Sequence, residues 1–285
     1  MTSPAVAPVA SPASPVDAVS QLVARRELGG PFALLTFEHE TVAGATPGQF
    51  AMVQPEAGGD LLLRRPFSIM DTDPRTGRFT IFLKAIGPGS RAVFDLRVGQ
   101  RARVLGPLGR GFTPPRAGEL VLLVGGGYGV APFALMSRAL RESRASFHLF
   151  YGGRSAAELP LVEELESRGI PVTLSTDDGS RGARGRVTAP LLEVLDRETL
   201  GGRAPRLCAC GPEAMMHAVA KIAAERGIAC EVSLDPWMGC GLGTCLGCVV
   251  KIQDPGEAKP KNRPACTDGP VFDATRVVWP HGETR

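Results

Sequence analysis

Short apolar runs separated by turn residues dominate the chain between residues 17 and 115. Runs such as FALLTFE, FAMVQ and FTIFLKAIG alternate there with clusters of Gly, Pro and Asp. Strand-length segments bounded by turn signals at this spacing are typical of a small antiparallel barrel. The pattern therefore predicts a β barrel over residues 17–115.

The pattern changes near residue 117, where apolar runs begin to alternate with segments of helical period. LVLLVGGG precedes APFALMSRALRESR, and RLCACGP precedes EAMMHAVAKIAAERG. Strands that alternate with helices predict βαβ units around a parallel sheet, which we expect over residues 116–229. Residues 230–285 are too few to build a sizeable core alone, so we expect a bound group to organise them.

The beginning of the chain, MTSPAVAPVASPASP, has neither the basic start nor the continuous apolar stretch of a signal peptide. Its Ala, Pro and Ser content predicts a disordered tail over residues 1–16. The apolar stretch VLLVGGGYGVAPFALM is interrupted by glycines and a proline, so we interpret it as strand, loop and helix, not as a membrane span. These features predict a cytoplasmic protein that has no membrane partner.

The composition and the charge exclude several classes of protein. Hydrophobic residues make up 44% of the 285 residues, which excludes global disorder. The net charge is +3 and the basic residues are scattered, so the sequence shows no cluster of basic residues that would bind nucleic acid. The seven cysteines are odd in number and too few for a disulfide scaffold. Four of them lie between residues 240 and 266, which favours metal ligation in a reducing compartment.

Four cysteines follow the spacing C-x4-C-x2-C-x17-C. The first two intervals, followed by a distant fourth cysteine, are those of plant-type [2Fe–2S] proteins, in which four thiolates bind the cluster. The glycines between them allow a loop to fold tightly and to point N–H groups at sulfur. A structural zinc site is the alternative, although zinc sites more often use two C-x2-C pairs. The predicted ligands are Cys240, Cys245, Cys248 and Cys266; Cys208 and Cys230 are predicted to be small buried residues.

Two further motifs contain residues that could bind a nucleotide. Gly125, Gly127 and Gly129 follow an apolar run and open a helix, which would let a backbone approach a pyrophosphate. The pattern is G-x-G-x-x-P, so a plain strand–helix turn remains an alternative. Arg65 and Ser68 lie on a predicted barrel strand in the stretch RPFS. The arginine could bind a diphosphate and the hydroxyl a ring nitrogen, with a solvated arginine as the alternative.

Taken together, RPFS, GGGYGVAP and CGPEAMM resemble the ferredoxin-reductase family of FAD-dependent NAD(P)H oxidoreductases. The order of LRRPFSI, GPGS, GPLGRGF, TDDGSRGARGRVT and MGCGLGTCLGCVVK resembles, within it, the electron-transfer subunits of NAD-linked heteromeric dihydroorotate dehydrogenase, over about residues 20–279. The resemblance implies a FAD-binding barrel, an NAD-binding α/β domain and a C-terminal [2Fe–2S] segment.

The resemblance also implies roles for individual residues. Arg65 would hold the FAD diphosphate, Phe67 would lie along the flavin, and Ser68 would contact it near N5. The nicotinamide pocket would be bordered by Cys210, Gly211 and Pro212. The remaining residues implied to line FAD are Pro66, Phe82, Leu83, Lys84, Gly89 and Ser90. Two departures stand out: Phe67 occupies a position that is often Ile, and DPGEAKPKNRP before Cys266 resembles a loop insertion.

These groups together predict an electron-transfer path. A nicotinamide exchanges two electrons at once and a cluster exchanges one, and FAD can link them because it can do both. The resemblance implies that the partner is the FMN-containing catalytic subunit of dihydroorotate dehydrogenase, in a heterotetramer of two each, in UMP synthesis. Apolar residues near Met238, Leu242 and Leu246 could dock it, or they could simply pack the cluster loop. No catalytic residue is predicted in this chain, since its histidines are isolated: His39, His148, His217 and His281.

Three alternatives remain open. The chain could be a reductase component that serves a ferredoxin or an oxygenase, or a non-catalytic zinc-binding or nucleotide-sensing module. Arg154 and Ser155 could meet a 2′-phosphate of NADP, whereas the resemblance implies NAD as the co-substrate.

Overall fold

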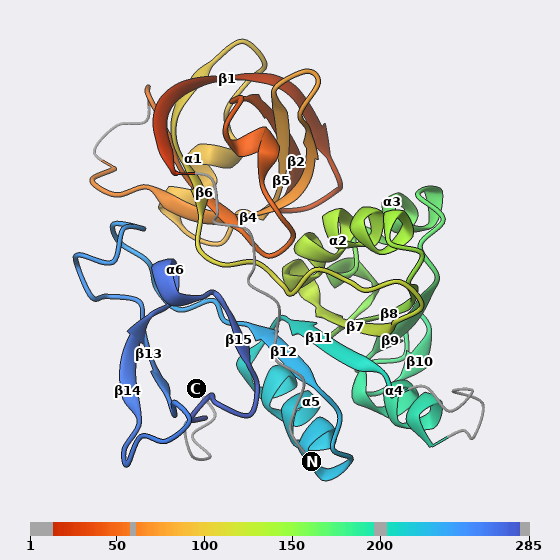
Figure 1. Ribbon diagram of the computed structural model, residues 1–285. Helices are drawn as coiled ribbons and strands as arrows, with labels where there is room; N and C mark the ends of the chain where they lie inside the picture. Colours follow the sequence, from red (N-terminus) through yellow and green to blue (C-terminus); the bar gives the residue numbers. More distant parts are fainter. Residues whose placement is uncertain (1–13, 58–60, 197–203, 280–285) are drawn as a thin grey trace.

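The computed structural model describes residues 14–57, 61–196 and 204–279. Figure 1 shows three parts: a barrel in red to yellow, a sheet flanked by helices in green to cyan, and a small lobe in blue. The predicted tail over residues 1–16 lies outside the described residues up to residue 13, and strand β1 begins at Val16.

Six antiparallel strands close the barrel in the order β1-β2-β5-β4-β3-β6. Alternate side chains point inward, and Phe37 stacks on Phe79 at 5.6 Å inside the barrel. Helix α1 (Pro88–Phe94) adds Val93 and Phe94 to the same core. The strands are β1 (Val16–Glu27), β2 (Phe32–Glu38), β3 (Phe50–Pro55), β4 (Arg65–Asp73), β5 (Arg78–Lys84) and β6 (Arg101–Leu108), with a 3-10 turn, η1 (Val42–Gly44), after β2.

The second part is a seven-stranded sheet in the order β10-β9-β8-β7-β11-β12-β15. All neighbours are parallel except β15, which runs antiparallel to β12. The strands are β7 (Leu120–Gly126), β8 (Ser146–Gly153), β9 (Val172–Thr176), β10 (Ala183–Arg184), β11 (Arg206–Cys210), β12 (Cys230–Ser233) and β15 (Val271–Asp273).

Helices cover both faces of this sheet (Figure 1). Because successive side chains of a strand point to opposite faces, Val121 and Leu123 pack in the cluster of α2 and α3, whereas Leu122 and Val124 pack in that of α4 and α5. The helices are α2 (Ala131–Glu142), α3 (Val162–Ser167), α4 (Thr188–Leu195) and α5 (Glu213–Glu225), with 3-10 turns η2 (Gly127–Val130) and η3 (Ala156–Glu158).

The small lobe contains the hairpin β13 (Val249–Ile252) and β14 (Lys261–Pro264), followed by the short helix α6 (Ala265–Asp268). The predicted loop insertion before Cys266 is therefore only partly a loop, since its last residues form β14. The sheet also extends beyond the predicted boundary at residue 229. Strand β12 follows that boundary and pairs with β11, because its buried Val232 completes the sheet core.

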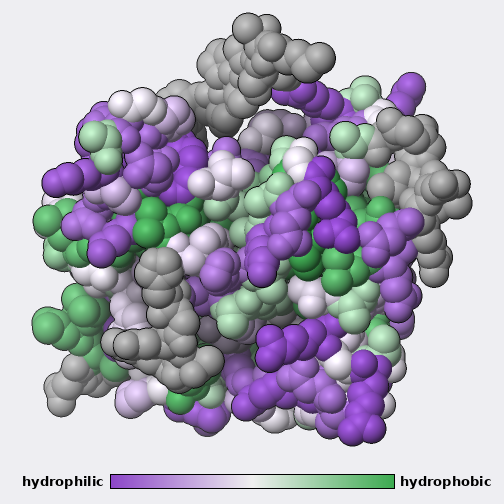
Figure 2. Space-filling view, turned by 90° about the horizontal axis from the view of Figure 1, so that it is seen from below, coloured by the Kyte–Doolittle hydropathy of each residue, from purple (hydrophilic) through white to green (hydrophobic). Residues whose placement is uncertain are grey.

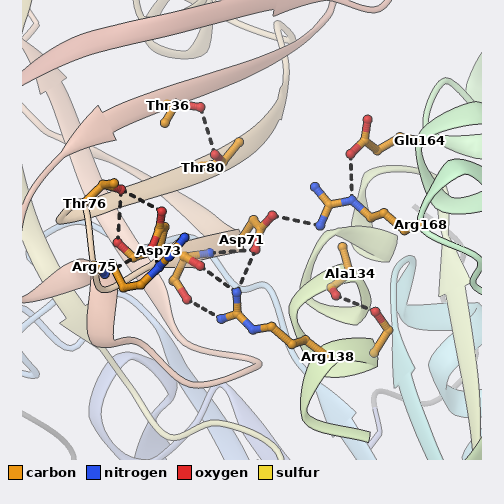
Figure 3. A network of polar contacts seen from close by, with 12 residues as sticks. Thr36, Asp71, Asp73, Arg75, Thr76, Thr80, Ala134, Arg138, Glu164 and Arg168 are labelled. Atoms are coloured by element: carbon orange, nitrogen blue, oxygen red, sulfur yellow. Dashed lines mark hydrogen bonds and ion pairs between the residues drawn. The ribbon is translucent and has the colours of Figure 1, made fainter. Parts of the chain in front are cut away.

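Ion pairs join the barrel to the α/β part. Figure 3 shows the guanidinium groups of Arg138 on α2 and Arg168 after α3 pointing towards Asp71 on β4. The nitrogen–oxygen distances are 3.4 and 2.8 Å, and Arg168 also binds Glu164 at 2.6 Å. Leu135 of α2 packs into the barrel core, so apolar contact supports this junction.

The surface shows no extended apolar belt on the face seen in Figure 2, where hydrophobic patches alternate with hydrophilic residues. Within residues 14–57, 61–196 and 204–279, no helix is both long enough and apolar enough to cross a membrane.

Candidate functional site

A cavity of about 830 Å³ lies where the barrel, the sheet and the small lobe meet. Its volume is near the upper end of the range of about 300–1,000 Å³ that is typical of ligand sites. Strands β7 and β11 end at this cavity. The strand order reverses between them, because β8 lies on one side of β7 and β11 on the other. Open α/β sheets bind ligands at such a switch point.

The barrel wall of the cavity contains most of the residues that the sequence predicted for FAD. They come from β4, from β5 and from α1: Arg65, Pro66, Phe67, Ser68, Phe82, Leu83, Lys84 and Ser90. Gly89 is explained by its neighbour, since an added Cβ would lie 2.1 Å from Nε of Arg65. The arginine therefore lies directly over the start of α1, where only glycine leaves room.

Two of these residues are already engaged in protein contacts. The Ser90 hydroxyl accepts hydrogen bonds from the backbone N–H groups of Ile86 at 2.8 Å and Gly87 at 3.1 Å. Lys84 pairs with Glu158 at 2.9 Å and lies over the ring of Phe32. Their side chains thus hold the wall together in addition to facing the cavity.

The nucleotide wall is formed by the turns after β7 and β11. Gly129, Cys210, Gly211 and Pro212 line the cavity. The two turns are tightly packed, since a Cβ on Gly129 would lie 2.6 Å from the carbonyl oxygen of Cys210. The predicted residues Gly125 and Gly127 are not among the lining residues, and Gly125 instead packs closely against Val130.

Sequence reasoning missed several cavity residues, among them Tyr128 and Asp235. Asp235 remains accessible to the solvent in the cavity, while the surrounding protein raises the pKa of its carboxyl group. Burial, and then the charge of Asp235, raise the pKa of the Cys210 thiol to about 12, so this thiol is neutral. A short motif search does not find Asp235, because it is an isolated acid after β12.

The cysteine loop, residues 240–248, points N–H groups at sulfur. Backbone N–H groups donate to Sγ of Cys240, Cys245 and Cys266, and the shortest of these bonds runs from Gly243 to Cys266 at 3.1 Å. Desolvation raises the pKa of Cys240, but hydrogen bonds from Thr244 and the backbone outweigh it and lower the pKa to about 6. This loop therefore stabilises thiolate, the form that binds metal.

The four cysteines form two pairs. Cys240 lies beside Cys245 and Cys248 lies beside Cys266, close enough for Cys245 to affect the pKa of Cys240 and for Cys248 to affect that of Cys266. The part of the chain that the structure describes has no group of three or more His, Cys, Asp and Glu side chains around one ion position. Two pairs fit a cluster of two irons that each take two thiolates, whereas a tetrahedral zinc needs all its ligands around one point.

The cysteine loop also packs against the barrel. Gly241 has φ +75°, and an added Cβ would lie 2.8 Å from Cγ of Met52 on β3. Phe50, two residues earlier on β3, lines the cavity. Strand β3 therefore contacts the loop and also lines the cavity.

Comparisons with known proteins agree with this geometry. Residues 235–278 match the family described as the iron-sulfur cluster binding domain of dihydroorotate dehydrogenase B, and residues 123–221 match the oxidoreductase NAD-binding domain. A solved NADH-dependent reduced ferredoxin-NADP oxidoreductase, studied for flavin-based electron bifurcation, superposes with a TM-score of 0.78. Identity is 28%, over 92% of this chain and 90% of that one. The ferredoxin reductase in carbazole 1,9a-dioxygenase (24% identity, TM-score 0.63, 75% and 67% coverage) shares the fold.

Two curated relatives carry the same name, dihydroorotate dehydrogenase B (NAD(+)), electron transfer subunit. The protein of Desulforamulus reducens is 35% identical over 82% of this chain and 87% of its own length. That of Shouchella clausii is 40% identical over 81% and 86%. The fold class predicted from the sequence, a barrel plus an α/β domain plus a cysteine segment, is confirmed. The chain belongs to the family of electron transfer subunits of NAD-dependent dihydroorotate dehydrogenase B.

Proposed function

We propose that this protein carries electrons from the FMN catalytic subunit of dihydroorotate dehydrogenase, through a [2Fe–2S] cluster and FAD, to NAD⁺ in UMP biosynthesis. The observation that carries the proposal is the single strand β3, which contacts the cysteine loop through Met52 and lines the cavity through Phe50. This arrangement provides a short path between a cluster and a flavin. The three parts of the relay are FAD on residues 17–115, NAD on 116–229 and the cluster on 230–285.

FAD would bind to the barrel wall. When bound, it supplies the chemistry that links two-electron exchange with nicotinamide to one-electron exchange with a cluster. Arg65, whose guanidinium packs over Gly89 in the cavity wall, would pair with the diphosphate, and Ser68 would face the ring. Lys84 holds the same wall through Glu158. Additional residues proposed for FAD are Pro66, Phe67, Phe82, Leu83 and Ser90.

The cluster would be of the [2Fe–2S] type. The 2 + 2 pairing of Cys240 with Cys245 and of Cys248 with Cys266 supports two irons, and the backbone N–H groups directed at sulfur support bound thiolates. Zinc remains the alternative that metal analysis separates, because a zinc protein contains no sulfide.

NAD(H) would place its nicotinamide between the barrel and the turn of Cys210, Gly211 and Pro212, and its pyrophosphate over Gly125, Gly127 and Gly129. The neutral Cys210 thiol leaves the pocket wall without a thiolate charge. Arg154 is paired at 2.8 Å with Glu158, a carboxylate that Lys84 shares at 2.9 Å and that would repel a 2′-phosphate next to Arg154. This pair supports NAD over NADP.

The partner would dock near the cysteine loop. Leu242 and Leu246 are 50% and 59% exposed, which suits a protein interface. Met238 departs from the expectation, since it packs against the sheet core and lines the cavity. We propose a heterotetramer of two subunits of each kind in the cytoplasm, where the seven free cysteines remain reduced.

The test is to measure two reactions, first on the isolated chain and then after adding the catalytic subunit. Alone, the chain should oxidise NADH with an artificial acceptor. Only the mixture should reduce NAD⁺ with dihydroorotate. Dihydroorotate-dependent NADH formation by the isolated chain would refute this division of labour.

A reductase that serves a ferredoxin or an oxygenase is the second candidate. The similarity to the ferredoxin-NADP oxidoreductase, at 28% identity and a TM-score of 0.78, supports this second function. Electron transfer from NADH to a ferredoxin, together with no activity in the mixture with the catalytic subunit, would select this function.

A further inference from the structure

The cavity has a second wall that the relay described above does not use. Part of its lining comes from the small lobe and the end of the described chain, including Lys251, Val278 and Trp279. These residues belong together structurally, because Ile252 bridges to Val277 and the Val278 N–H donates to the carbonyl oxygen of Lys251 at 3.0 Å. The segment 276–278 thus lies beside β13 like an added strand.

Trp279 is held in one orientation. Its ring stacks on His217 of α5, with centroids 5.2 Å apart and an interplanar angle of 12°. It also packs against the sheet core. A tryptophan that is fixed on one face and lines a cavity offers a flat apolar platform, which is the usual partner of a nucleic acid base. Lys251 adds a positive charge to the same wall.

The position of this wall relative to Arg65 suggests which base it would meet. Arg65 donates to the carbonyl oxygen of Leu63 at 2.7 Å, and Leu63 lies 3.9 Å from the Cβ position of Gly239 in the small lobe. The proposed diphosphate site therefore lies at the end of β4 that faces the small lobe. A dinucleotide flavin that extends past its diphosphate from there reaches this lobe.

The sheet order argues against the adenosine of NAD. Its expected place is above β7 and β8, beyond the glycine turn. The small lobe lies beside β12 and β15, on the opposite side of β7. Among the described residues, those that line the cavity include none from β8, β9 or β10. The two adenosines would thus lie at opposite ends of the site.

We propose that the wall formed by Lys251, Val278 and Trp279 binds the adenosine half of FAD, with Trp279 stacking on the adenine. This inference rests on the proposed FAD function and adds the means by which the chain would distinguish FAD from FMN, which lacks that half. Arg65 contacts a phosphate that both flavins carry, so it cannot make this distinction.

The experiment compares FAD and FMN binding to the full-length chain after the flavin has been removed, with dissociation constants from the quenching of flavin fluorescence. Trp279→Ala should weaken FAD binding about 5- to 150-fold, the loss expected for one base–aromatic stack, and leave FMN binding unchanged. Trp279→Phe, which keeps a ring on His217, should lose less, and Lys251→Ala should weaken FAD more than FMN.

Trp237 supplies a matched control, because it is 94% exposed and does not line the cavity. Trp237→Ala should change neither constant. The chain has only two tryptophans, so in Trp237→Phe the emission of Trp279 can be followed alone. FAD should quench this emission more than FMN does.

Different failures are distinguishable. If Trp279→Ala binds FAD as tightly as the wild type, or loses FAD and FMN equally, the adenosine assignment is overturned while the FAD function stands. If the variant instead raises the KM for NADH and keeps FAD, the wall belongs to the nicotinamide dinucleotide and the proposal is again overturned. A wild-type chain that binds neither flavin would overturn both this proposal and the FAD function.

Discussion

Replacing Gly129 by alanine tests whether the close contact between the two nucleotide-wall turns is needed for hydride transfer. The added Cβ would lie 2.6 Å from the carbonyl oxygen of Cys210 and from the backbone of Gly211, about 0.8 Å short of the 3.4 Å at which ordinary contact begins. These neighbours are backbone atoms, so no side-chain rotation relieves the overlap. The turn that borders the proposed nicotinamide pocket must move instead.

The expected cost follows from that displacement. Overpacking of this kind costs about 1–3 kcal/mol of stability. A misplacement of about 1 Å between reacting groups can cost on the order of 100-fold in rate. We therefore expect the kcat/KM for NADH with ferricyanide to fall by about 10- to 100-fold in Gly129→Ala, at unchanged FAD and iron content.

The matched control is Gly44→Ala, because an added Cβ at Gly44 meets no atom within 4 Å and the residue does not have a left-handed φ. Its kcat/KM should equal that of the wild type. The measurement is steady-state kinetics on protein whose flavin and iron have been quantified. Wild-type kcat/KM in a folded, fully loaded Gly129→Ala protein would show that the contact does not position the nicotinamide, and the reasoning would be refuted.

Three further predictions use other contacts. Cys245→Ser should lose iron and the EPR signal of the reduced cluster, and purification of the wild type with stoichiometric zinc and no sulfide would contradict the ligand assignment. Arg65→Ala should weaken FAD binding by roughly 10- to 150-fold, the value of a charge-assisted contact of about 1.5–3 kcal/mol, and equal retention of FAD would show a misassigned arginine. Arg206→Met should lower the free energy of unfolding by about 3–5 kcal/mol at pH 7, because it leaves the partly buried carboxylates of Glu119 and Glu231 unpaired. Burial raises the pKa of Glu119, but the bonds from Arg206 outweigh it and lower that pKa below its ordinary value of 4.5. The wild type therefore keeps this stabilisation above pH 4.5 and loses it as pH falls through the lowered pKa, so the deficit of the variant in urea unfolding should shrink as pH falls below 4.5.

The features that the sequence predicted well are local ones. Strand and helix periods depend on side chains a few residues apart, so the barrel and the alternating α/β part were visible before any contact was known. The cysteine spacing is also local for its first three members, because one loop must wrap one group. RPFS was recognisable for the same reason, since four consecutive residues of β4 carry it.

Other features depend on pairings between distant segments, which local patterns do not encode. The interval before Cys266 suggested a loop, but β14 forms there because it has β13 as a partner. Met238 was expected either to dock the partner or to pack the cluster loop, and the structure places it half-buried against the sheet core. Asp235 and Trp279 are isolated in the sequence and become cavity residues only when the chain returns through β12 and beside β13. The sequence by itself determined the chemistry of the chain, namely its thiolates, its glycine turns and its arginine. The tertiary structure decided which of these groups share a cavity, because burial and long-range strand pairing bring together residues that are far apart along the chain.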